Sequence, residues 1–284
     1  MAGLPDGPFA DIRVARSMLF VPGDRADRFA KASASGADAV ICDLEDAVPP
    51  ERKTAARHQV VDWLTGPGSA CVRINATADP AHQEDCASLR SLTSLRGVVV
   101  PKAEDPAGLE DVHAALGGGV PLIALIETAL GVHRAHDLAS AGGVARLAFG
   151  SIDLALDAGM AQHDQALLFA RSTLVIASRA ARIAAPLDGV TTDFSDGDVV
   201  RVAARTAKDL GFGGKLCIHP AQVEPVNKGF SPTDEELAWA QKVVDHSAGS
   251  GASRLDGHMV DRPVIERAHA ILDWGRSTDA EVKR

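Results

Sequence analysis

Eight short apolar runs, separated by helix-like segments, constrain the fold more than any other feature of this chain. The runs span residues 17–22, 38–44, 70–75, 97–102, 121–127, 146–151, 186–190 and 215–220. They are almost continuously apolar, which is typical of strands that are buried on both faces of a parallel sheet. Eight alternations of strand and helix favour an α/β fold, a (β/α)8 TIM barrel. A doubly wound open sheet is the alternative, but its GxGxxG fingerprint after a strand is missing.

The segments between the runs have helical periodicity, as in ADRFAKASASG, KTAARHQVVDWL, PAHQEDCASLRSL and DQALLFARSTLVIASRAAR. Asp24 and Thr54 precede or open such segments and are expected to cap their helices. Gly36, Gly66 and Gly211 fall where helices should end. These start and stop signals support the alternation of strands and helices.

The chain is expected to have three parts: a flexible N-terminal tail (1–15), the barrel (16–230) and a C-terminal helical extension (231–284). In the extension, two helix-like pieces, SPTDEELAWAQKVVDHSA and HMVDRPVIERAHAILDWG, flank a Gly/Ser-rich hinge near 248–253. Ser231 is the expected N-cap of the first piece, and Glu235 completes a capping-box pattern. Such an extension suits a lid, or an arm exchanged between subunits. A loose tail is the alternative.

Charge and composition exclude several classes of function. The formal net charge is -9, aromatic residues make up 4% of the chain, and there is no tyrosine. This argues against a general nucleic-acid or anionic-membrane surface, although it permits a local basic pocket for a phosphorylated ligand. No run reaches the ~18 apolar residues of a membrane span, and the N-terminus lacks the apolar region of a signal peptide. We therefore expect a cytoplasmic protein with no nucleic-acid or membrane partner.

The four cysteines indicate structural thiols. Cys42, Cys71 and Cys217 lie inside apolar runs, where cysteine behaves as a small hydrophobic residue, and Cys86 lies in a helix-like segment. No CxxC spacing suggests a zinc site or redox chemistry. We expect all four to be reduced.

The reactive groups of a TIM barrel gather at the C-terminal ends of its strands. In this chain those positions hold many acids and few bases: Asp24, Arg25, Asp43, Glu45, Asp46, Arg73, Asn75, Lys102, Glu104, Glu127, Ser151, Asp153, Lys215 and His219. Acids brought together in this way repel one another unless a cation lies among them. Oxygen-rich surroundings with few histidines favour a hard divalent ion.

Glu127 and Asp153 follow adjacent strands and are the predicted magnesium ligands. Mg2+ commonly takes one or two carboxylates and keeps its other positions for water and substrate. Asp43 and Glu45 are expected to hold metal-bound waters, whereas Asp46 is interpreted as a helix-start acid. In the alternative interpretation each of these acids stabilises the N-terminus of a helix.

Arg73, in the motif VRIN, ends an apolar strand, where an arginine is unfavourable to bury unless it is paired. Its planar guanidinium suits bidentate binding of a substrate carboxylate. An internal salt bridge to Asp43 or Glu45 is the alternative, and the two roles are compatible. His219, which has no second histidine at ligand spacing, is expected to have a structural hydrogen-bonding role.

Nine motifs in one order resemble a known family. They are RSMLFVPGDR, GADAVICDLEDAV followed by KTAAR, VRIN, VVVPKAE, LIALIET, FGSIDL, DGV, GKLCIHPAQ and DGHMVD. Together they resemble the citrate lyase beta-subunit-like proteins of the HpcH/HpaI aldolase superfamily, which includes malyl-CoA and citramalyl-CoA lyases. The resemblance covers residues 16–272. Each motif is weak alone, but nine in the same order are specific.

The resemblance implies a Mg2+-dependent carbon–carbon lyase that forms a trimer or a dimer of trimers. Such enzymes cleave a 3-hydroxyacyl thioester, such as citryl-, malyl- or citramalyl-CoA, into acetyl-CoA and a keto acid. By this resemblance Glu127 and Asp153 bind Mg2+ and Arg73 holds the carboxylate of the keto-acid half. Asp261, in the late MVD motif, is implied as a catalytic residue. In relatives the C-terminal element folds over a neighbouring subunit's site, and the sequence leaves open whether Asp261 acts there or in its own subunit. The family often has lysine where this chain has His258.

The thioester carrier, CoA or the pantetheine of an acyl-carrier protein, requires cationic anchors. Arg16, Arg25 and Lys31 in the first βα unit are candidate phosphate contacts, with Lys102 nearby. Two other functions stay open: a thioesterase or synthase acting at the same site, and a non-catalytic subunit of a larger citrate lyase complex. Intact acids at the site and in the extension argue against the non-catalytic subunit.

Overall fold

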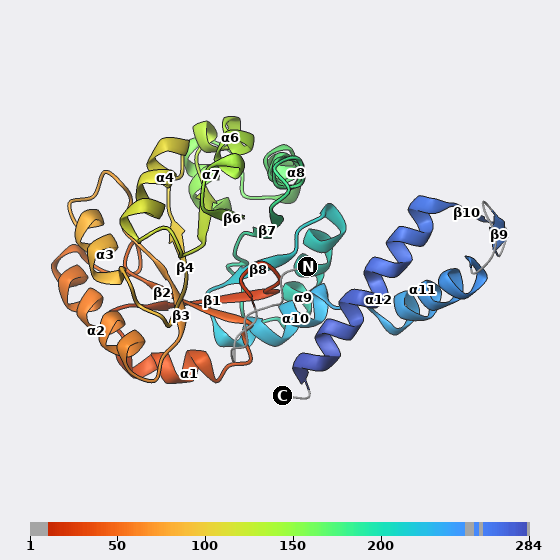
Figure 1. The fold of residues 1–284 in the computed structure, drawn as a ribbon, viewed down its shortest axis with the longest axis horizontal. Helices are drawn as coiled ribbons and strands as arrows, with labels where there is room; N and C mark the ends of the chain where they lie inside the picture. Colours follow the sequence, from red (N-terminus) through yellow and green to blue (C-terminus); the bar gives the residue numbers. More distant parts are fainter. Residues whose placement is uncertain (1–10, 248–252, 256–257, 283–284) are drawn as a thin grey trace. The chain divides into compact units, whose positions relative to one another are not determined.

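The computed structural model describes residues 11–247, 253–255 and 258–282, without the side chains of Ser253 and of residues 276–282. Eight parallel strands close into a barrel in chain order, and β1 is hydrogen-bonded to both β2 and β8 (Figure 1). This confirms the predicted TIM barrel. The strands are β1 (Ser17–Pro22), β2 (Ala39–Asp43), β3 (Ala70–Arg73), β4 (Leu95–Val100), β5 (Leu122–Ile126), β6 (Val144–Phe149), β7 (Ala184–Asp188) and β8 (Gly214–Cys217).

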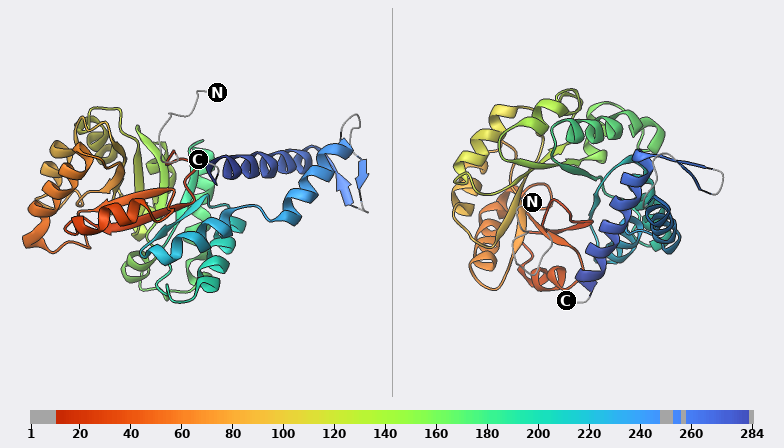
Figure 2. Two further views of the ribbon diagram at one scale, coloured as in Figure 1. Left: turned by 90° about the horizontal axis from the view of Figure 1, so that it is seen from below. Right: turned by 45° about the vertical axis from the view of Figure 1, so that its right-hand side comes forward.

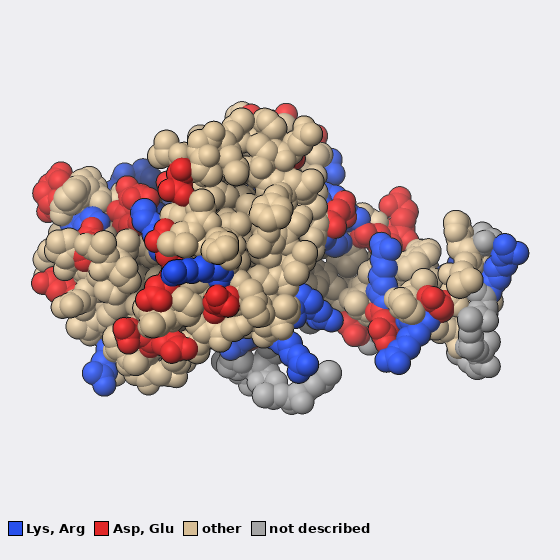
Figure 3. Space-filling view, turned by 90° about the horizontal axis from the view of Figure 1, so that it is seen from above, with Lys and Arg blue, Asp and Glu red and all other residues tan. Residues whose placement is uncertain are grey.

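Helices surround the strands on the outside of the barrel (Figures 1 and 2). They are η1 (Ala26–Arg28), α1 (Phe29–Ser33), η2 (Pro50–Arg52), α2 (Lys53–Thr65), α3 (His82–Leu89), α4 (Pro106–Ala115), α5 (Ala129–His133), α6 (Ala135–Ser140), α7 (Ser151–Asp157), α8 (Asp164–Ala180), α9 (Gly197–Leu210), η3 (Pro220–Gln222) and α10 (Val223–Phe230), where η marks a 3-10 helix. The side of the barrel that Figure 3 shows includes a broad area in which few charged side chains are exposed.

The helix-ending glycines were predicted better than the helix-capping residues. Gly211 ends α9 with φ 103°, in the left-handed region that favours glycine. Thr54 lies inside α2, whose N-cap is Arg52, so it does not cap that helix. Asp24 caps no helix either, because its carboxylate pairs with Arg52 at 3.0 Å.

The strands are apolar throughout because both of their faces are covered. Every residue of β2, β5, β6 and β8 is buried. One set of side chains fills the barrel interior, including Met18, Ile41, Val99, Ile123 and Leu216, and the alternate set packs under the helices. A strand buried on both faces cannot show the polar–apolar alternation of an exposed sheet.

The N-terminal end of the barrel is closed by residues 11–15. Ile12 and Ala15 belong to the barrel core. The fully buried Arg146 holds them, because its Nη1 donates to the carbonyl oxygens of Ile12 at 2.8 Å and Ala15 at 2.7 Å, and its Nε to that of Ala185 at 2.6 Å. Residues 11–15 are therefore part of the barrel and not of the expected flexible tail. The rest of that tail, 1–10, lies outside the described residues.

The chain forms two compact units, Met1–Asn227 and Lys228–Arg284. The second contains α11 (Asp234–Ser247), β9 (Ser253–Leu255), β10 (His258–Val260) and α12 (Arg262–Val282). Strands β9 and β10 pair as an antiparallel hairpin. A flexible connection was expected at β9, and His258–Val260, which form β10, were expected to begin a helix, so that part of the prediction is wrong. The buried core of this second unit consists of Ala240, Val243, Val260 and Ala268. Most of the predicted hinge near 248–253 lies outside the described residues.

The capping box of α11 is shifted from its predicted place. The backbone N–H of Glu236 donates to Thr233 Oγ1 at 3.1 Å, and the N–H of Thr233 donates to Glu236 Oε2 at 2.9 Å. The predicted pair, Ser231 and Glu235, is wrong because the helix begins at Asp234 and requires its reciprocal acid one residue later.

The four cysteines are buried free thiols, as expected. Burial raises the pKa of Cys71 and Cys217 to about 12 and that of Cys86 to about 11. These values leave the thiols protonated and unreactive near neutral pH.

Within the described part of the chain, none of the helices has both the length and the apolar character that a membrane crossing requires.

Replacing Arg146 by methionine should destabilise the barrel. The carbonyl oxygens of Ile12, Ala15 and Ala185 would stay buried without a donor, so the free energy of unfolding should fall by about 2–4 kcal/mol. Urea denaturation measures this loss. The control is Arg90→Met at an exposed position, which should change stability by less than about 0.5 kcal/mol. Equal effects of the two variants would contradict a structural role for Arg146.

Candidate active site

The C-terminal ends of the strands surround a cavity of about 360 Å³. Its apolar wall includes Phe20, Leu125, Phe149, Val190 and Leu216. Its polar lining consists of Asp43, Asp46, Arg73, Glu127, Ser151 and Asp153. The barrel therefore brings together the two acids and the arginine that the sequence predicted for one site.

Glu127 directly follows β5, and only 2% of its surface is exposed. Its Oε1 accepts a hydrogen bond from the backbone N–H of Lys102 at 2.8 Å. A Cβ at Gly150 would lie 2.3 Å from the Cβ of Glu127, so only glycine leaves room for this side chain. The N-cap of α5 is Thr128, and Glu127 lies outside the helix. The helix-dipole interpretation therefore fails for Glu127.

The electrostatics of this acid pair favour a bound cation. Burial raises the pKa of Glu127 from 4.5 to about 7; the backbone N–H of Lys102 lowers it, and the carboxylates of Glu45 and Asp153 raise it further. Asp153 lies in the first turn of α7, half-buried, on the cavity wall. A cation between Glu127 and Asp153 would relieve both the burial and the repulsion.

The donor set fits magnesium. Among residues 11–247, 253–255 and 258–282, no three His, Cys, Asp or Glu side chains are arranged to hold a metal ion together. Glu127 and Asp153 would thus supply two carboxylates, and water and substrate the remaining positions. Mg2+ is bound in this way, whereas structural zinc requires four protein ligands.

Arg73 is held in place by two buried acids. Its Nε and Nη2 donate to the two oxygens of Asp43 at 2.7 and 2.6 Å, and its Nη1 lies 3.0 Å from Glu45 Oε2. Burial lowers the pKa of Arg73, but the hydrogen bond and charge of Asp43, with the charge of Glu45, outweigh it and hold the pKa above its usual range. The salt-bridge role is therefore present. Asp43 accepts from two of the five guanidinium N–H groups, and the ion pair with Glu45 is not a hydrogen bond, so within the described structure three N–H groups remain for a substrate carboxylate.

Lys102 connects the two halves of the site. Its Nζ donates to Glu45 Oε1 at 2.5 Å while its backbone N–H donates to Glu127. Lys102 has φ 47°, a left-handed conformation that is rare for lysine and common at functional sites. Burial raises the pKa of Glu45, although Arg73 and Lys102 lower it. Arg73 and Lys102 thus compensate the negative charges of Asp43 and Glu45. Within the described structure, neither of these two cationic side chains forms an ion pair with Glu127.

A buried network beyond β3 supports Arg73. The side chain of Asn75 donates to Asp85 Oδ2 at 2.6 Å and accepts from Lys53 Nζ. Its backbone N–H also donates to Asp85 Oδ2 at 2.9 Å, and its carbonyl oxygen lies 2.8 Å from His82 Nδ1. Arg57 Nε completes the network at 2.7 Å from Asp85 Oδ1. Each polar group of Asn75 therefore has a partner within the protein, and these bonds fix the loop after β3.

Sequence reasoning missed Lys53, Arg57 and Asp85. The first two belong to the motif KTAAR, which the sequence singled out without a role. Asp85 is an acid beside Cys86 on the buried face of α3. An acid at such a position requires a partner, and this was the available signal.

The structure places the predicted carrier-binding cations differently. The prediction for Arg16 is wrong, because Arg16 precedes β1 and so lies at the N-terminal end of the strand. There it is 8% exposed and donates hydrogen bonds to Asp38 at 2.8 and 2.9 Å. Arg25 follows β1 on the catalytic side and pairs with Asp27 at 2.9 Å. Lys31 is exposed on α1. Contact of Arg25, Lys31 or Lys102 with a carrier stays a prediction.

Three further predicted residues are placed as follows. Asp46 lines the cavity from an exposed loop, and the next helix begins only at Pro50, so the helix-start interpretation is wrong. His219 accepts from the N–H of Ala221 at 3.2 Å, which agrees with its expected structural role. Asp261 belongs to the second unit, where it accepts from the N–H of Val264 at 3.4 Å at the start of α12. Its catalytic role stays a prediction.

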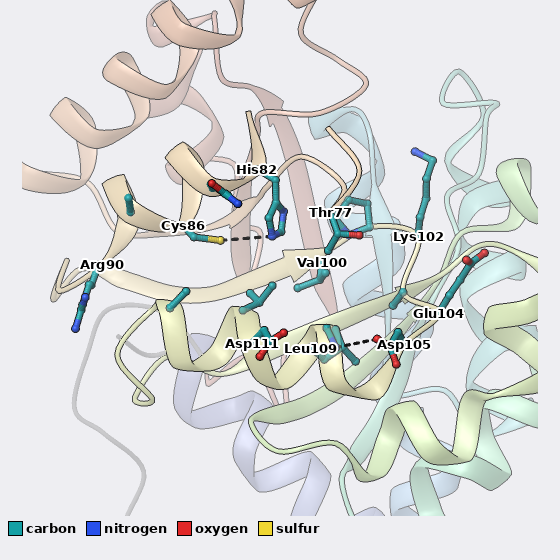
Figure 4. Close-up of a pocket in the computed structure, with 17 residues that line it drawn as sticks. Thr77, His82, Cys86, Arg90, Val100, Lys102, Glu104, Asp105, Leu109 and Asp111 are labelled. Atoms are coloured by element: carbon teal, nitrogen blue, oxygen red, sulfur yellow. Dashed lines mark hydrogen bonds between the residues drawn. The ribbon is translucent and has the colours of Figure 1, made fainter. Parts of the chain in front are cut away.

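A larger cavity of about 800 Å³ lies between α3 and α4 (Figure 4). Arg90 and Lys102 lie at its opposite ends, and Cys86 Sγ lies 3.9 Å from His82 Nε2 in its wall. The cavity contains neither Arg73 nor the acid pair Glu127 and Asp153. The smaller cavity is therefore the candidate active site.

Known proteins resemble this chain over most of its length. The family model described as HpcH/HpaI aldolase/citrate lyase matches residues 16–220. A citrate lyase subunit beta-like protein of Deinococcus radiodurans is 38% identical over 275 residues, covering 90% of this chain and 96% of the relative. A (3S)-malyl-CoA thioesterase of Cereibacter sphaeroides is 31% identical over 280 residues, covering 92% and 97%. The crystal structure of CitE from Mycobacterium tuberculosis, in complex with magnesium, acetoacetate and coenzyme A, is 34% identical, with a TM-score of 0.82 and coverage of 93% and 100%.

The raised pKa of Glu127 makes the stability of the metal-free protein depend on pH. Between pH 4.5 and about 7 the native state holds a proton that the unfolded state has lost, so stability falls as pH rises through this window. With a chelator present at about pH 8, Glu127→Gln should exceed wild type by roughly 3 kcal/mol in unfolding free energy, and by little at about pH 5.

Urea denaturation at the two pH values measures this difference. Mg2+ at the higher pH should stabilise wild type and leave Glu127→Gln unchanged, because the variant lacks a ligand. The exposed Glu51→Gln is the control and should behave as wild type. A pH-independent difference between Glu127→Gln and wild type would contradict the assigned electrostatics.

Proposed function

Because the chain belongs to the HpcH/HpaI aldolase/citrate lyase family, we propose that it is a Mg2+-dependent carbon–carbon lyase acting on a 3-hydroxyacyl-CoA thioester. The products are acetyl-CoA and a keto acid, and the reverse direction forms the bond. The observation that carries this proposal is the meeting of Arg73, Glu127 and Asp153 in one cavity at the strand ends. The similarity to CitE bound to magnesium and coenzyme A supports the same cofactor and carrier.

Each residue has a role that its contacts allow. Glu127 and Asp153 would hold Mg2+, which as a Lewis acid would lower the pKa of the substrate hydroxyl. Arg73 binds the carboxylate of the keto-acid half through N–H groups that Asp43 does not use. Asp43 and Glu45 fix the guanidinium before substrate arrives. The apolar wall around Phe20, Phe149 and Leu216 excludes water from the reacting carbons.

Bond cleavage requires one proton to leave and one to arrive. The substrate hydroxyl gives its proton to solvent water, the bond to the thioester's α-carbon breaks, and the electron pair passes to the thioester enolate. Asp261, as general acid, protonates that carbon to give the acetyl group. In the oligomer that we propose, a trimer, Asp261 comes from a neighbouring subunit.

A thioesterase is the second candidate function, because a relative of similar length and coverage is named a (3S)-malyl-CoA thioesterase. The same cavity would then direct water to the thioester carbonyl. Free CoA and a hydroxy acid would appear without a keto acid. The products therefore separate the two functions.

The decisive assay offers malyl-CoA, citramalyl-CoA and citryl-CoA in parallel to purified protein with Mg2+, with the products identified by mass. One of them should give acetyl-CoA and its keto acid, and chelation should abolish the reaction. Glu127→Gln and Asp153→Asn should each lower kcat by about 10³-fold or more. The control is Glu104→Gln, which should keep wild-type kcat because Glu104 lines the larger cavity.

Other results of this assay have definite meanings. CoA with a free hydroxy acid would replace the lyase by the thioesterase. Turnover that survives both Glu127→Gln and Asp153→Asn would contradict the metal assignment. No turnover of any CoA thioester, with Mg2+ bound, would favour a carrier-protein substrate or a non-catalytic subunit.

Mixing two inactive variants tests whether Asp261 acts on a neighbouring subunit. Asp261→Asn retains an intact cavity and Glu127→Gln retains an intact acid, so mixed oligomers contain some complete sites. Equal, random mixing should restore about a quarter of wild-type activity, because each complete site needs two independent choices. The control is each variant mixed with itself. Recovery of no activity after verified subunit exchange would place Asp261 in its own subunit's site or outside catalysis.

A further inference from the structure

A buried cluster of charges that the proposed reaction does not use lies between β7, β8 and α8 (Figure 1). Lys215 Nζ lies 2.7 Å from Asp188 Oδ2, and Nε and Nη2 of Arg171 donate to the two oxygens of Asp188 at 3.1 and 3.2 Å. The three residues are 4–5% exposed. Their neighbours Leu187 and Leu216 belong to the barrel core, so Asp188 and Lys215 point to the outside of their strands, toward the helices.

The buried charges of this cluster do not cancel. Two cations share one carboxylate, which leaves one net positive charge. Asp164 Oδ1 lies 3.2 Å from Arg171 Nη1, but the Asp164 side chain is 84% exposed, so water screens most of its charge. An uncompensated buried charge is unfavourable, and a bound anion would compensate it.

Lys215 is the surplus cation. Arg171 alone already contacts both oxygens of Asp188, so this carboxylate has a complete partner without the lysine. Burying a second cation beside a complete ion pair adds a desolvation cost that the pair does not require. The cluster therefore has the charge of a site for a second anion.

Both cations keep hydrogen-bond donors for such an anion. Within the described structure, Lys215 uses one of its three ammonium hydrogens, and Arg171 uses three of its five N–H groups. The guanidinium carbon of Arg171 also lies 4–6 Å above an aromatic ring, at 5.6 Å from the ring centre of Phe212, which helps to fix its plane.

The two cations line a cavity of about 240 Å³. Ser151, Thr191 and Thr192, which carry hydroxyl groups, line it as well. The N-terminus of α8 borders the cavity, and the helix dipole favours negative charge there. One water takes about 30 Å³ of the liquid, so the cavity has room for roughly eight small heavy atoms. This suits phosphate or a short carboxylic acid and is too small for a nucleotide.

We propose that this cavity binds a small oxyanion, either inorganic phosphate or the carboxylate of a short acid. Lys215 and Arg171 supply charge-assisted hydrogen bonds to its oxygens. The cavity is distinct from the candidate active site, because Arg73, Glu127 and Asp153 do not line it. The two cavities share part of one wall, at the start of α7. The proposal stands whether the chain is a lyase or a thioesterase.

Isothermal titration calorimetry of the full chain, after divalent ions have been dialysed away, tests the proposal. Phosphate and succinate are titrated separately, and the tighter ligand identifies the source of the anion. Wild type should bind at least one of them with a Kd on the order of 1 mM or tighter, as two charge-assisted hydrogen bonds allow.

Two variants should shift this affinity in opposite directions. Lys215→Met removes the surplus cation and should weaken binding at least about 10-fold. Asp188→Asn removes the buried negative charge and should tighten binding at least about threefold. Both variants break the ion pair between Asp188 and Lys215, so a purely structural role predicts no gain of affinity in either. The matched control is Arg179→Met, which removes an exposed cation of the same helix and should change Kd by less than about twofold.

Circular dichroism checks the fold of each variant. If Lys215→Met does not fold, Asp188→Asn still decides: tighter binding supports the proposal, and unchanged or weaker binding overturns it. Wild-type affinity in a folded Lys215→Met would also overturn it, as would the absence of saturable binding of both anions below about 50 mM. Binding that Arg73→Gln abolishes and Lys215→Met retains would place the anion in the catalytic cavity instead, against the proposal.

Discussion

Closing eight parallel strands into a barrel forces their carboxyl ends together, and the rest of the site follows from the acids placed there. Asp43, Glu45, Glu127 and Asp153 all line or border one cavity. Burying that much negative charge is unfavourable unless each carboxylate is paired, protonated or bound to a cation. The raised pKa of Glu127 shows that its pairing is incomplete in the protein alone.

The protein's own cations compensate only part of this charge. Arg73 and Lys102 pair with Asp43 and Glu45, and the contact that Lys102 makes with Glu127 is through its backbone N–H. Two acids are thus used to orient an arginine, and two are left for a metal ion. The sequence predicts metal-bound waters at Asp43 and Glu45, and the structure shows these two acids paired with Arg73 and Lys102. The tightly held Arg73 still keeps N–H groups for a substrate.

The sequence predicts those parts that depend on local pattern and on the direction of the strands. All eight strands and the positions of Glu127, Asp153 and Arg73 follow from apolar runs and from what stands at their C-terminal ends. Contacts between distant segments are not encoded in this way. Arg146 holds residues 11–15 from more than a hundred positions away, and the Asn75 network joins three segments. Arg16 was wrong for a simpler reason, since it precedes its strand.

The supports of the site indicate how the proposed chemistry is divided. Arg73 is fixed by Asp43 and Glu45, and Glu127 by its close packing on Gly150 and by a backbone N–H, so the binding half of the site is formed before any ligand arrives. The proposed proton donor, Asp261, belongs instead to the separate C-terminal unit. Rigid positioning suits the metal and the keto acid, whose geometry must be exact to a fraction of an ångström. A donor on a separate unit is not part of that preformed half, and in the proposed trimer it comes from a neighbouring chain.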